Sequence, residues 1–349
     1  MSKRSPLQEP APFSRALVDW FDEVGKDYPW RRTRDPYAVL VSELMLQQTQ
    51  VATVLARRYF ENWMELFPTP AVLAAAPEEV VLKAWEGLGY YRRARNLQKA
   101  AMAIVDGHGG VFPHDPEAIL ALPGVGRYTA GAVACFAFGA PEPIVDGNIS
   151  RVLARLFDFN EEIDSTKGAR QLWEWAAALV PSERAREYNS GLMELGQTHC
   201  SVARPACGDC PVAGFCLTET PDRLPLRKPR AKTTRVDEHV RLVIDGGKLL
   251  LQQESGQRRG GLWKFPELSE SRLGTAELLH EMKYSITRYR VTLRVYADQR
   301  RPRGARELEG EGEVEVQAWF TRDELESLPM PSPYRKALVA LTESGRIFG

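Results

Sequence analysis

The stretch ALPGVGRYTAGAV, Ala121 to Val133, joins two segments of helical apolar spacing through the turn LPGVG at residues 122–126. Its two glycines let the backbone turn sharply and leave the N–H groups of the turn unhindered. The N-terminus of the following helix favours phosphate, because its N–H groups and its dipole both attract negative charge. A glycine turn between helices is common, so alone the stretch predicts a tight turn. A phosphate contact becomes the stronger interpretation only beside a nearby acidic residue.

Helical periodicity continues on both sides of this turn, over residues 1 to about 220. Asp35 supplies an N-cap and Pro36 a first-turn proline for one helix, and another helix is expected from about Val51. Further helices are expected near residues 71–84, 91–105, 116–121, 127–138, 148–157, 167–179 and 183–197. This part of the chain is therefore predicted to be mainly α.

The composition changes after this helical part. Residues 220–238, TPDRLPLRKPRAKTTRVDE, hold three prolines and six basic residues without helical or strand periodicity, which predicts an exposed linker at residues 223–237. Beyond it we expect a hairpin turning at residues 245–247, strands in RYRVTLRVYAD and VEVQAWF, and helices in GTAELLHEMK and SPYRKALVALTE. These elements predict a smaller α+β domain at residues 238–349.

The overall composition is that of a globular protein of two or three domains: 349 residues, 44% hydrophobic and 26% charged. No apolar run reaches the roughly 18 residues of a membrane helix, and the first residues lack the apolar segment of a secretory signal. We expect a cytoplasmic monomer without a membrane partner. Residues 1–222 hold 22 Lys and Arg against 28 Asp and Glu. Any DNA contact there must therefore come from local patches and backbone amides.

Four of the five cysteines lie within 17 residues, in CSVARPACGDCPVAGFC, with the spacing C-x6-C-x2-C-x5-C. Four thiolates in one loop can enclose a metal centre, and sulfur ligands select zinc or an iron–sulfur cluster. Only one close C-x2-C pair occurs, so the spacing favours the cluster and leaves zinc open. The four candidate ligands are Cys200, Cys207, Cys210 and Cys216, whereas Cys135 is expected in the core.

Two acidic residues are candidates for chemistry. Glu43 lies in the apolar run VSELMLQQTQV, and apolar residues flank it on its helix face, so burial should raise its pKa and keep a proton available. Asp146 precedes a helix in IVDGNISRVLARLF, where an N-cap is the simpler interpretation when it is taken alone. Asn148 could share the capping, or could orient a carboxylate or a water molecule.

Four features occur in one order: VSELMLQQTQV, GLGYYRRARNL, LPGVGRYTAGAV with VDGN, and the four-cysteine loop. Over residues 12–217 they resemble the helix-hairpin-helix DNA glycosylases with an iron–sulfur cluster, and among these the adenine glycosylases of the MutY type. The resemblance implies a six-helix barrel at about residues 38–146, and a [4Fe-4S] cluster lobe at about 1–37 and 147–222. GLWKFPE at residues 261–267 extends it to a Nudix-like domain. That domain lacks the Nudix acidic metal signature between residues 267 and 286, so binding without pyrophosphatase activity is expected.

The resemblance also implies a reaction: hydrolysis of the N-glycosidic bond of adenine opposite 8-oxoguanine or G in duplex DNA. A stacked base must be flipped out before it can be reached. Two carboxylates in opposite protonation states then meet the opposite charges that form on the sugar and the base. By resemblance Glu43 protonates adenine, and Asp146, near a helix N-terminus, stays ionised and stabilises the sugar cation. Tyr128 and Asn148 complete the expected catalytic group.

Further residues are expected by resemblance to contact the base or the DNA. Ser190 departs from the family, because relatives usually carry Gln or Glu there and a hydroxyl would need a bridging water to reach the base. The 8-oxoguanine loop of the family is Phe-Ser-His, and an ordinary polar entrance to a strand is the alternative for the matching residues here. Gln48 and Tyr90 are expected as wedges in the duplex, and the hairpin amides as phosphate contacts. The expected sets are Trp30, Arg31, Leu46 and Ser190 for the adenine pocket; Gln48, Thr49, Tyr90, Gly124, Val125 and Gly126 for DNA; and Ile286, Thr287 and Arg288 for 8-oxoguanine.

Tyr128 bears on the type of reaction. Relatives that also cut the DNA backbone carry a lysine at this position, and no lysine occurs from Ala101 to Thr166. We therefore expect a glycosylase without strong lyase activity. One alternative is an endonuclease III type enzyme of another base specificity, which Tyr128 and the extra domain disfavour. The other is a non-catalytic, redox-sensing iron–sulfur protein that binds DNA, which leaves both acidic residues unexplained.

Overall fold

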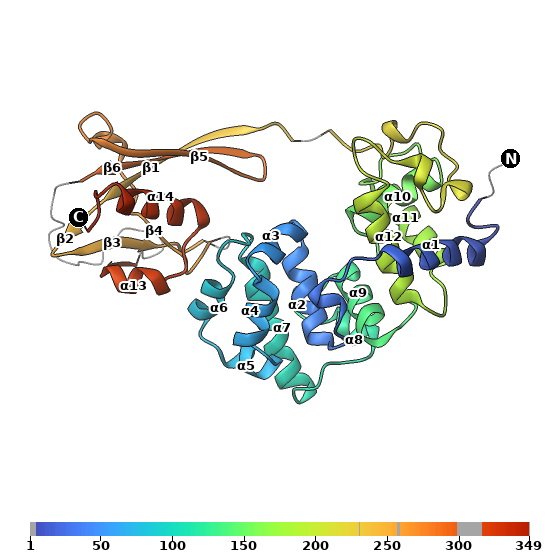
Figure 1. Ribbon diagram of the computed structural model, residues 1–349. Coiled ribbons are helices and arrows are strands. Elements are labelled where there is room, and N and C mark those ends of the chain that lie inside the picture. The colour runs from blue at the N-terminus through green and yellow to red at the C-terminus, as the bar shows by residue number, and fades with distance from the viewer. Residues whose placement is uncertain (1–4, 230, 257–258, 299–315, 349) are drawn as a thin grey trace. The chain divides into compact units, whose positions relative to one another are not determined.

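The computed structural model describes residues 5–229, 231–256, 259–298 and 316–348. The chain divides into two compact units, which we call the helical unit (Met1–Ala74 with Lys99–Pro229) and the mixed unit (Ala75–Gln98 with Arg230–Gly349). Figure 1 labels the α-helices of both units and the strands β1 to β6. The expected fold class, a mainly α region followed by an α+β region, is confirmed.

The helical unit consists of short helices. The expected helix from Val51 is two helices, because the backbone of Arg58 is left-handed with a φ of 50° and separates them. Among the described helices, none is long and apolar enough to cross a membrane. The helices are α1 (Pro10–Val24), α2 (Pro36–Leu46), α3 (Val51–Ala56), α4 (Tyr59–Leu66), α5 (Pro70–Ala75), α7 (Arg92–His108), which begins in the mixed unit, α8 (Pro116–Leu120), α9 (Arg127–Phe138), α10 (Gly147–Leu156), α11 (Thr166–Leu179) and α12 (Ala185–Thr198), with 3-10 turns η1 (Pro29–Arg31), η2 (Cys207–Asp209), η3 (Ala213–Phe215) and η4 (Pro221–Arg223).

Local capping fixes where the helices of the site begin. The Asp35 side chain accepts a hydrogen bond from the N–H of Tyr37 at 3.0 Å, and Pro36 opens α2, as the sequence predicts. The turn before α9 depends on Gly124, whose φ of 77° favours glycine, and Gly126 is the N-cap of α9. Helices α2 and α9 pack against each other, so both the apolar run and the glycine turn flank one site.

The N-terminal helix packs against the later helices of the helical unit. Helix α1 lies beside α12, as Figure 1 shows, and also contacts α11. Leu17 of α1 and Leu192 of α12 are buried in one core with Ile149 and Leu153 of α10, and each such leucine contributes about 1.5 to 3 kcal/mol of burial free energy. Gly191 permits the close approach, because a Cβ there would lie 3.1 Å from the Leu17 side chain.

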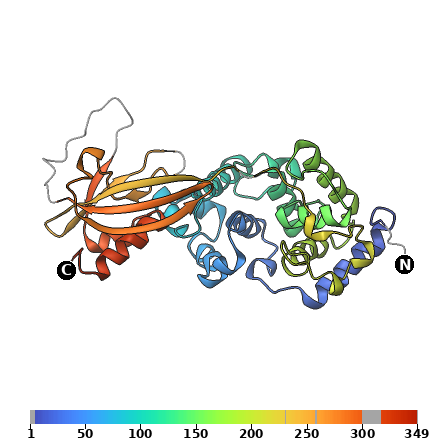
Figure 2. The ribbon, with the colours of Figure 1, turned by 90° about the horizontal axis from the view of Figure 1, so that it is seen from above.

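The mixed unit contains two sheets. In the first sheet, β6 (Tyr289–Ala297) lies between β1 (Thr234–Leu242), to which it is parallel, and β5 (Leu278–Ile286), to which it is antiparallel. Figure 2 shows these long strands side by side in yellow and orange. The second sheet has β3 (Lys248–Gln253) between β2 (Ile244–Asp245) and β7 (Gln317–Phe320), and β3 also pairs with β4 (Trp263–Lys264). Helices α13 (Arg322–Ser327) and α14 (Ser332–Glu343) follow, preceded by the short η5 (Glu270–Arg272).

Two expectations for this unit need correction. GTAELLHEMK was expected to be helical, but residues 278–286 form β5, because pairing along β6 and an alternation of exposed and half-buried side chains override the local preference. Residues 234–237 were expected in the linker, but they begin β1 through pairs such as Thr234 with Tyr289. The hairpin turn at residues 245–247 and the helix in SPYRKALVALTE are confirmed, and residues 314–315 of VEVQAWF lie outside the described part.

The segment Ala75–Gln98 belongs to the mixed unit although it lies early in the chain. It contains α6 (Glu78–Ala84), the GLGYYRRARNL loop and the start of α7. The Arg335 Nε of α14 lies 2.7 Å from Glu86 Oε1, and the Tyr91 hydroxyl donates to the Met330 carbonyl at 2.8 Å. This grouping differs from the expected domain limits, which place residues 75–98 in the barrel, and those limits stay a prediction.

Candidate active site

A pocket in the helical unit surrounds Glu43. Its volume is about 40 Å³, enough for a few water molecules. The expected adenine-pocket residues all line it, together with Glu43. The lining residues are Tyr28, Trp30, Arg31, Val39, Ser42, Glu43, Leu46, Val51, Phe136, Arg186, Ser190, Met193 and Gln197.

The Glu43 carboxyl lies on α2 with 5% of the residue exposed. Burial raises its pKa to about 7, because a charged carboxylate loses solvation there. The Tyr128 hydroxyl opposes this rise by donating a hydrogen bond to Glu43 Oε2 at 2.8 Å, the charge of Asp146 adds to it, and that of Arg31 opposes it. The carboxyl therefore holds a proton for much of the time near neutral pH, in the direction that its apolar helix face predicts.

The Arg31 side chain is held on one wall of the pocket. Its Nη1 donates to Glu194 Oε2 at 2.9 Å and to the Lys26 carbonyl at 2.8 Å. Its guanidinium also lies 4.7 Å from the ring centre of Tyr28 and 5.2 Å from that of Phe21. Glu194 is almost completely buried, so this ion pair is shielded from solvent on one side. The positive charge near Glu43 is therefore fixed in place rather than mobile.

Asp146 is the N-cap of α10, as the simpler interpretation of the sequence predicts. Its Oδ1 accepts from the Ile149 N–H at 2.7 Å and its Oδ2 from Asn148 Nδ2 at 3.1 Å. Burial nevertheless raises the pKa of Asp146, and these hydrogen bonds only oppose the rise. The helix N-terminus alone therefore does not set its ionisation, because burial outweighs the favourable donors.

A chain of hydrogen bonds leads from Asp146 to the cysteine loop. Asn148 bonds to Asp146 and accepts at its Oδ1 from Arg151 Nη2 at 2.9 Å. The Arg151 Nε donates to the Cys200 carbonyl at 2.7 Å. Helix α10 therefore places a candidate catalytic carboxylate and a candidate metal ligand on one hydrogen-bonded path.

The four cysteines of the loop differ in exposure: Cys207 is exposed, whereas Cys200, Cys210 and Cys216 are half-buried. Burial is the main cause that raises the pKa of Cys210, and the other three cysteines add to the rise. The Arg155 Nη1 lies 3.3 Å from Cys200 Sγ, a cation that suits an anionic sulfur centre. Across the described ranges, no three His, Cys, Asp or Glu side chains are grouped closely enough to hold a metal ion. The chemistry of the donor set fits a thiolate-held metal centre.

Three residues expected to contact DNA have unusual backbones. Gln48, Tyr90 and Thr287 are exposed and have φ values of 56°, 48° and 50°, in a region that side-chain-bearing residues rarely adopt. Such backbones cost free energy and gather at functional sites. Gln48 lies in the helical unit between α2 and α3, whereas Tyr90 and Thr287 lie in the mixed unit.

Hydrogen bonds from Arg93 and Trp85 hold the backbone of the loop that carries Tyr90. The Arg93 Nη2 donates to the carbonyls of Leu88 and Gly89 at 2.9 and 3.0 Å, and the Trp85 Nε1 also donates to the Gly89 carbonyl at 3.0 Å. The Arg93 guanidinium lies 5.3 Å from the Trp85 ring centre and 5.5 Å from that of Tyr90. These contacts hold the exposed Tyr90 ring outward on a fixed loop.

The remaining expected contacts lie in turns. Gly124 and Gly126 are exposed on either side of the buried Val125, whose N–H donates within the turn to the Leu122 carbonyl at 3.1 Å. Thr49 lies between α2 and α3 and is half-buried. Ile286 ends β5, and the Arg288 guanidinium lies 5.2 Å from the ring centre of the following tyrosine.

Several pocket residues were not expected from the sequence. Tyr28 and Phe136 come from separate parts of the chain, and nothing in the sequence brings them together, whereas Arg186 lies on α12 four residues before Ser190. Met193 and Gln197 follow Ser190 on α12 at intervals of three and four residues, so helical periodicity could have indicated them. The Arg186 guanidinium joins these walls, because it donates to the carbonyls of Phe136 and Arg31.

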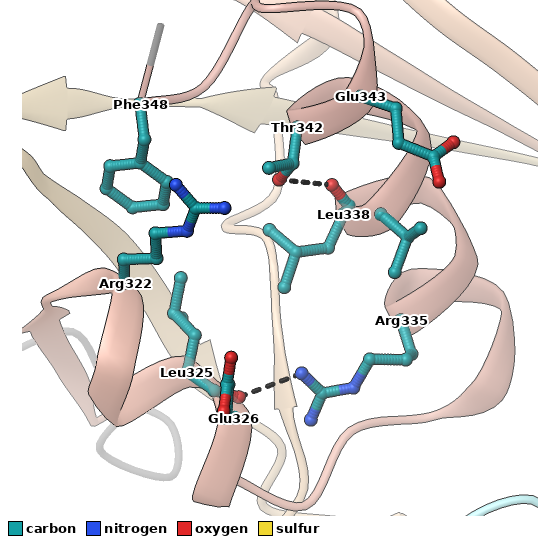
Figure 3. A pocket seen from close by; sticks show the side chains of 9 residues that line it. Arg322, Leu325, Glu326, Arg335, Leu338, Thr342, Glu343 and Phe348 are labelled. Carbon is teal, nitrogen blue, oxygen red and sulfur yellow. Dashed lines mark hydrogen bonds between the residues drawn. The ribbon is translucent and has the colours of Figure 1, made fainter.

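A separate pocket of about 190 Å³ lies in the mixed unit between α13 and α14 (Figure 3). Among its charged lining residues, Arg335 donates to the Leu325 carbonyl at 2.8 Å and pairs with Glu86, so its guanidinium holds helices together. None of the candidate site residues lines this pocket.

Comparison with known proteins places the chain in a family. Residues 41–178 match the model of the HhH-GPD superfamily base excision DNA repair protein. The chain is 46% identical over 219 residues to the adenine DNA glycosylase of Homo sapiens, covering 60% of this chain and 40% of that protein. It is 36% identical over 296 residues to that of Arabidopsis thaliana, covering 72% and 46%. It is 41% identical over 215 residues to that of Mycobacterium tuberculosis, covering 59% and 70%.

Solved structures agree with this placement. A thermostable thymine-DNA glycosylase is 31% identical with a TM-score of 0.55, covering 60% of this chain and 96% of that one. An endonuclease III trapped in a covalent DNA intermediate is 26% identical with a TM-score of 0.52, covering 60% and 95%. The matched part of the chain spans less than half the length of the human and Arabidopsis relatives. The chain belongs to the HhH-GPD superfamily of base excision DNA repair proteins, as a member of its adenine DNA glycosylase family.

Proposed function

We propose that this protein removes adenine from duplex DNA by hydrolysing its N-glycosidic bond, with adenine opposite 8-oxoguanine or G as the substrate. The observation that carries the proposal is the Glu43 carboxyl, which lines a pocket and has its pKa raised to about 7. A group that is poised near neutral pH serves as a general acid. Family membership supports DNA as the partner and adenine as the base.

The first step is proton transfer to the flipped base. Glu43 gives its proton to adenine, so the electron pair of the glycosidic bond leaves with a base that is already protonated. Tyr128 keeps the resulting Glu43 carboxylate hydrogen-bonded at 2.8 Å, which favours the charged form once the proton has gone. The Tyr128 hydroxyl therefore stabilises the Glu43 carboxylate that this proton transfer produces.

The second step stabilises the sugar cation and adds water. Asp146, oriented by the Ile149 N–H and the Asn148 amide, supplies negative charge where positive charge forms. Water then adds to the sugar and releases one proton, which restores Glu43 to its acid form. Tyr128 replaces the lysine that a lyase would use, so we propose a monofunctional glycosylase.

We further propose that Cys200, Cys207, Cys210 and Cys216 hold a [4Fe-4S] cluster. The cluster would fix the loop of residues 200–216, and Arg155 would balance part of its charge. Two measurements test this assignment: the visible absorbance of the cluster in the wild type, and the loss of the ordered structure of residues 200–216 when Cys210 is substituted. A colourless protein that binds one zinc ion would instead favour a zinc site.

For the opposite base we propose the hairpin tip of residues 286–288 in the mixed unit. Thr287 has a left-handed backbone and an exposed side chain whose hydroxyl donates to the Ile286 carbonyl at 2.7 Å, and Arg288 beside it supplies a cation. Thr287→Ala should reduce the preference for adenine opposite 8-oxoguanine over adenine opposite G. An unchanged preference would show that this loop does not recognise 8-oxoguanine.

We propose that the protein acts as a cytoplasmic monomer.

The decisive experiment is single-turnover excision from duplexes with adenine opposite 8-oxoguanine, G, C or T. Glu43→Gln should bind the duplex normally yet lose excision by several orders of magnitude, because an amide cannot give up the proton. Glu117→Gln makes the same chemical change on the exposed face of α8 and should leave the rate unchanged. Near-normal rates for Glu43→Gln would sink the assignment, and efficient borohydride trapping of DNA would contradict the absence of lyase activity.

A further inference from the structure

We propose that Gln197 determines base specificity: its side-chain carbonyl accepts a hydrogen bond from the exocyclic amino group of the flipped adenine. The inference rests on the proposed function and adds a specificity-determining residue to the same pocket. Gln197 lines that pocket together with Glu43, at the last turn of α12.

The position of Gln197 on α12 directs its side chain toward the base. Ser190, Met193 and Gln197 share one face of the helix and all line the pocket. Seven residues correspond to about 10.5 Å along a helix axis, and long helical side chains point back toward the helix N-terminus. A long side chain at Gln197 is therefore expected to lie over the turn of Met193, toward the buried Ser190.

The neighbouring Gly196 places this part of α12 beside the sugar-side carboxylate. A Cβ at Gly196 would lie 2.7 Å from the Cβ of Asn148, so the backbone of α12 touches the start of α10 there. Asn148 in turn bonds to Asp146 at 3.1 Å. Gln197 therefore directly follows the residue that touches Asn148, whose side chain holds Asp146.

The Gln197 amide is available for a ligand. The side chain is exposed, and it has no hydrogen-bond partner among the residues that the structure describes. Other polar groups of the pocket are engaged within the protein: Arg31 bonds to Glu194, Glu43 accepts from Tyr128, and Arg186 donates to two backbone carbonyls. Gln197 therefore offers a donor and an acceptor that folding does not use.

The chemistry of the amide matches adenine. Adenine presents an amino group as a donor on the edge that also carries N7, whereas guanine has an acceptor oxygen at the same position. The carbonyl oxygen of Gln197 can accept from that amino group. Ser190 lies deeper on the same face, has only a short hydroxyl, and is buried. Gln197 is therefore the longer of the two polar side chains that α12 directs to the base.

The test compares adenine with purine, which lacks the amino group, each placed opposite 8-oxoguanine and measured by single-turnover excision. Gln197→Ala should lower the ratio of the adenine rate to the purine rate about tenfold, the value of one hydrogen bond of about 1.4 kcal/mol. Gln197→Glu keeps an acceptor oxygen and should retain the wild-type ratio even if both rates change. Thr198→Ala, an exposed neighbour that does not line the pocket, should leave the ratio and both rates unchanged.

The outcomes separate the two proposals. If the wild type releases no adenine at all, the proposed function fails. If the wild type is active but Gln197→Ala retains the wild-type ratio, or if Gln197→Glu loses it as fully as alanine does, the inference about Gln197 is overturned.

Discussion

Replacing Tyr128 with phenylalanine should move the pH dependence of excision to higher pH. The Tyr128 hydroxyl donates to Glu43 Oε2 at 2.8 Å and thereby lowers the pKa of Glu43, which burial has raised. Without that donor the charged carboxylate loses its hydrogen bond, so the acid form persists at higher pH. The direction is therefore a further rise of the Glu43 pKa above about 7.

The size of the shift follows from the hydrogen bond. A bond to a charged group contributes about 1.5 to 3 kcal/mol, and one pKa unit corresponds to about 1.36 kcal/mol. The pKa of Glu43 should therefore rise by about one to two units, to roughly 8 or 9. Because catalysis needs protonated Glu43, the rate of the wild type should fall as pH rises through about 7. That of the variant should fall only above the higher value.

The assay is the single-turnover rate of adenine release across the neutral and alkaline range. Tyr37→Phe is a matched control, because the Tyr37 hydroxyl is buried on the same helix but donates to the Phe67 carbonyl at 2.9 Å and not to Glu43. It should leave the midpoint unchanged. A midpoint for Tyr128→Phe that equals or lies below that of the wild type would refute the reasoning.

Three other changes give distinct readouts. Glu43→Gln should stabilise the fold above pH 7 and not below pH 4.5. Below pH 4.5 the Glu43 carboxyl is neutral in both the folded and the unfolded protein, so it costs no stability there. Above pH 7 it is charged in both, and the rise of its pKa from 4.5 to about 7 on folding lowers the free energy of unfolding by about 3 kcal/mol. Urea unfolding of the wild type and the variant at both pH values measures this difference. Gly196→Ala should lower the free energy of unfolding by about 1 to 3 kcal/mol and slow excision, because the new Cβ would lie 2.7 Å from the Cβ of Asn148. A variant with both wild-type stability and the wild-type rate would contradict this expectation. Arg93→Ala should reduce base flipping as much as Tyr90→Ala does, because Arg93 holds the loop that carries Tyr90. The fluorescence of 2-aminopurine in the duplex measures flipping. Wild-type flipping by Arg93→Ala would contradict this role of Arg93.

Local chemistry explains which parts of the fold were predictable. The N-cap at Asp35, the glycine turn before α9 and the cap at Asp146 depend on residues adjacent in the chain, so their helices begin where the sequence indicates. The strand at residues 278–286 was not predictable in this way. Its residues can form a helix or a strand, and pairing with β6 decides between them.

The candidate site likewise has features that the sequence predicts and features that only folding produces. The amino-acid sequence alone indicates the four thiols of the loop, the acid in an apolar helix and the absence of a lysine beside Asp146, because each is a matter of residue type and short spacing. The pKa of Glu43 depends on Tyr128, Asp146 and Arg31, which folding brings from other parts of the chain. The groups that lower the pKa of Asp146 lie on its own helix, and only the burial that raises it comes from the tertiary structure. The convergence of Arg31 and Gln197 on one pocket also comes from folding. Electrostatic effects fall off with distance in space rather than along the chain, so only the packing of α2, α9, α10 and α12 sets them.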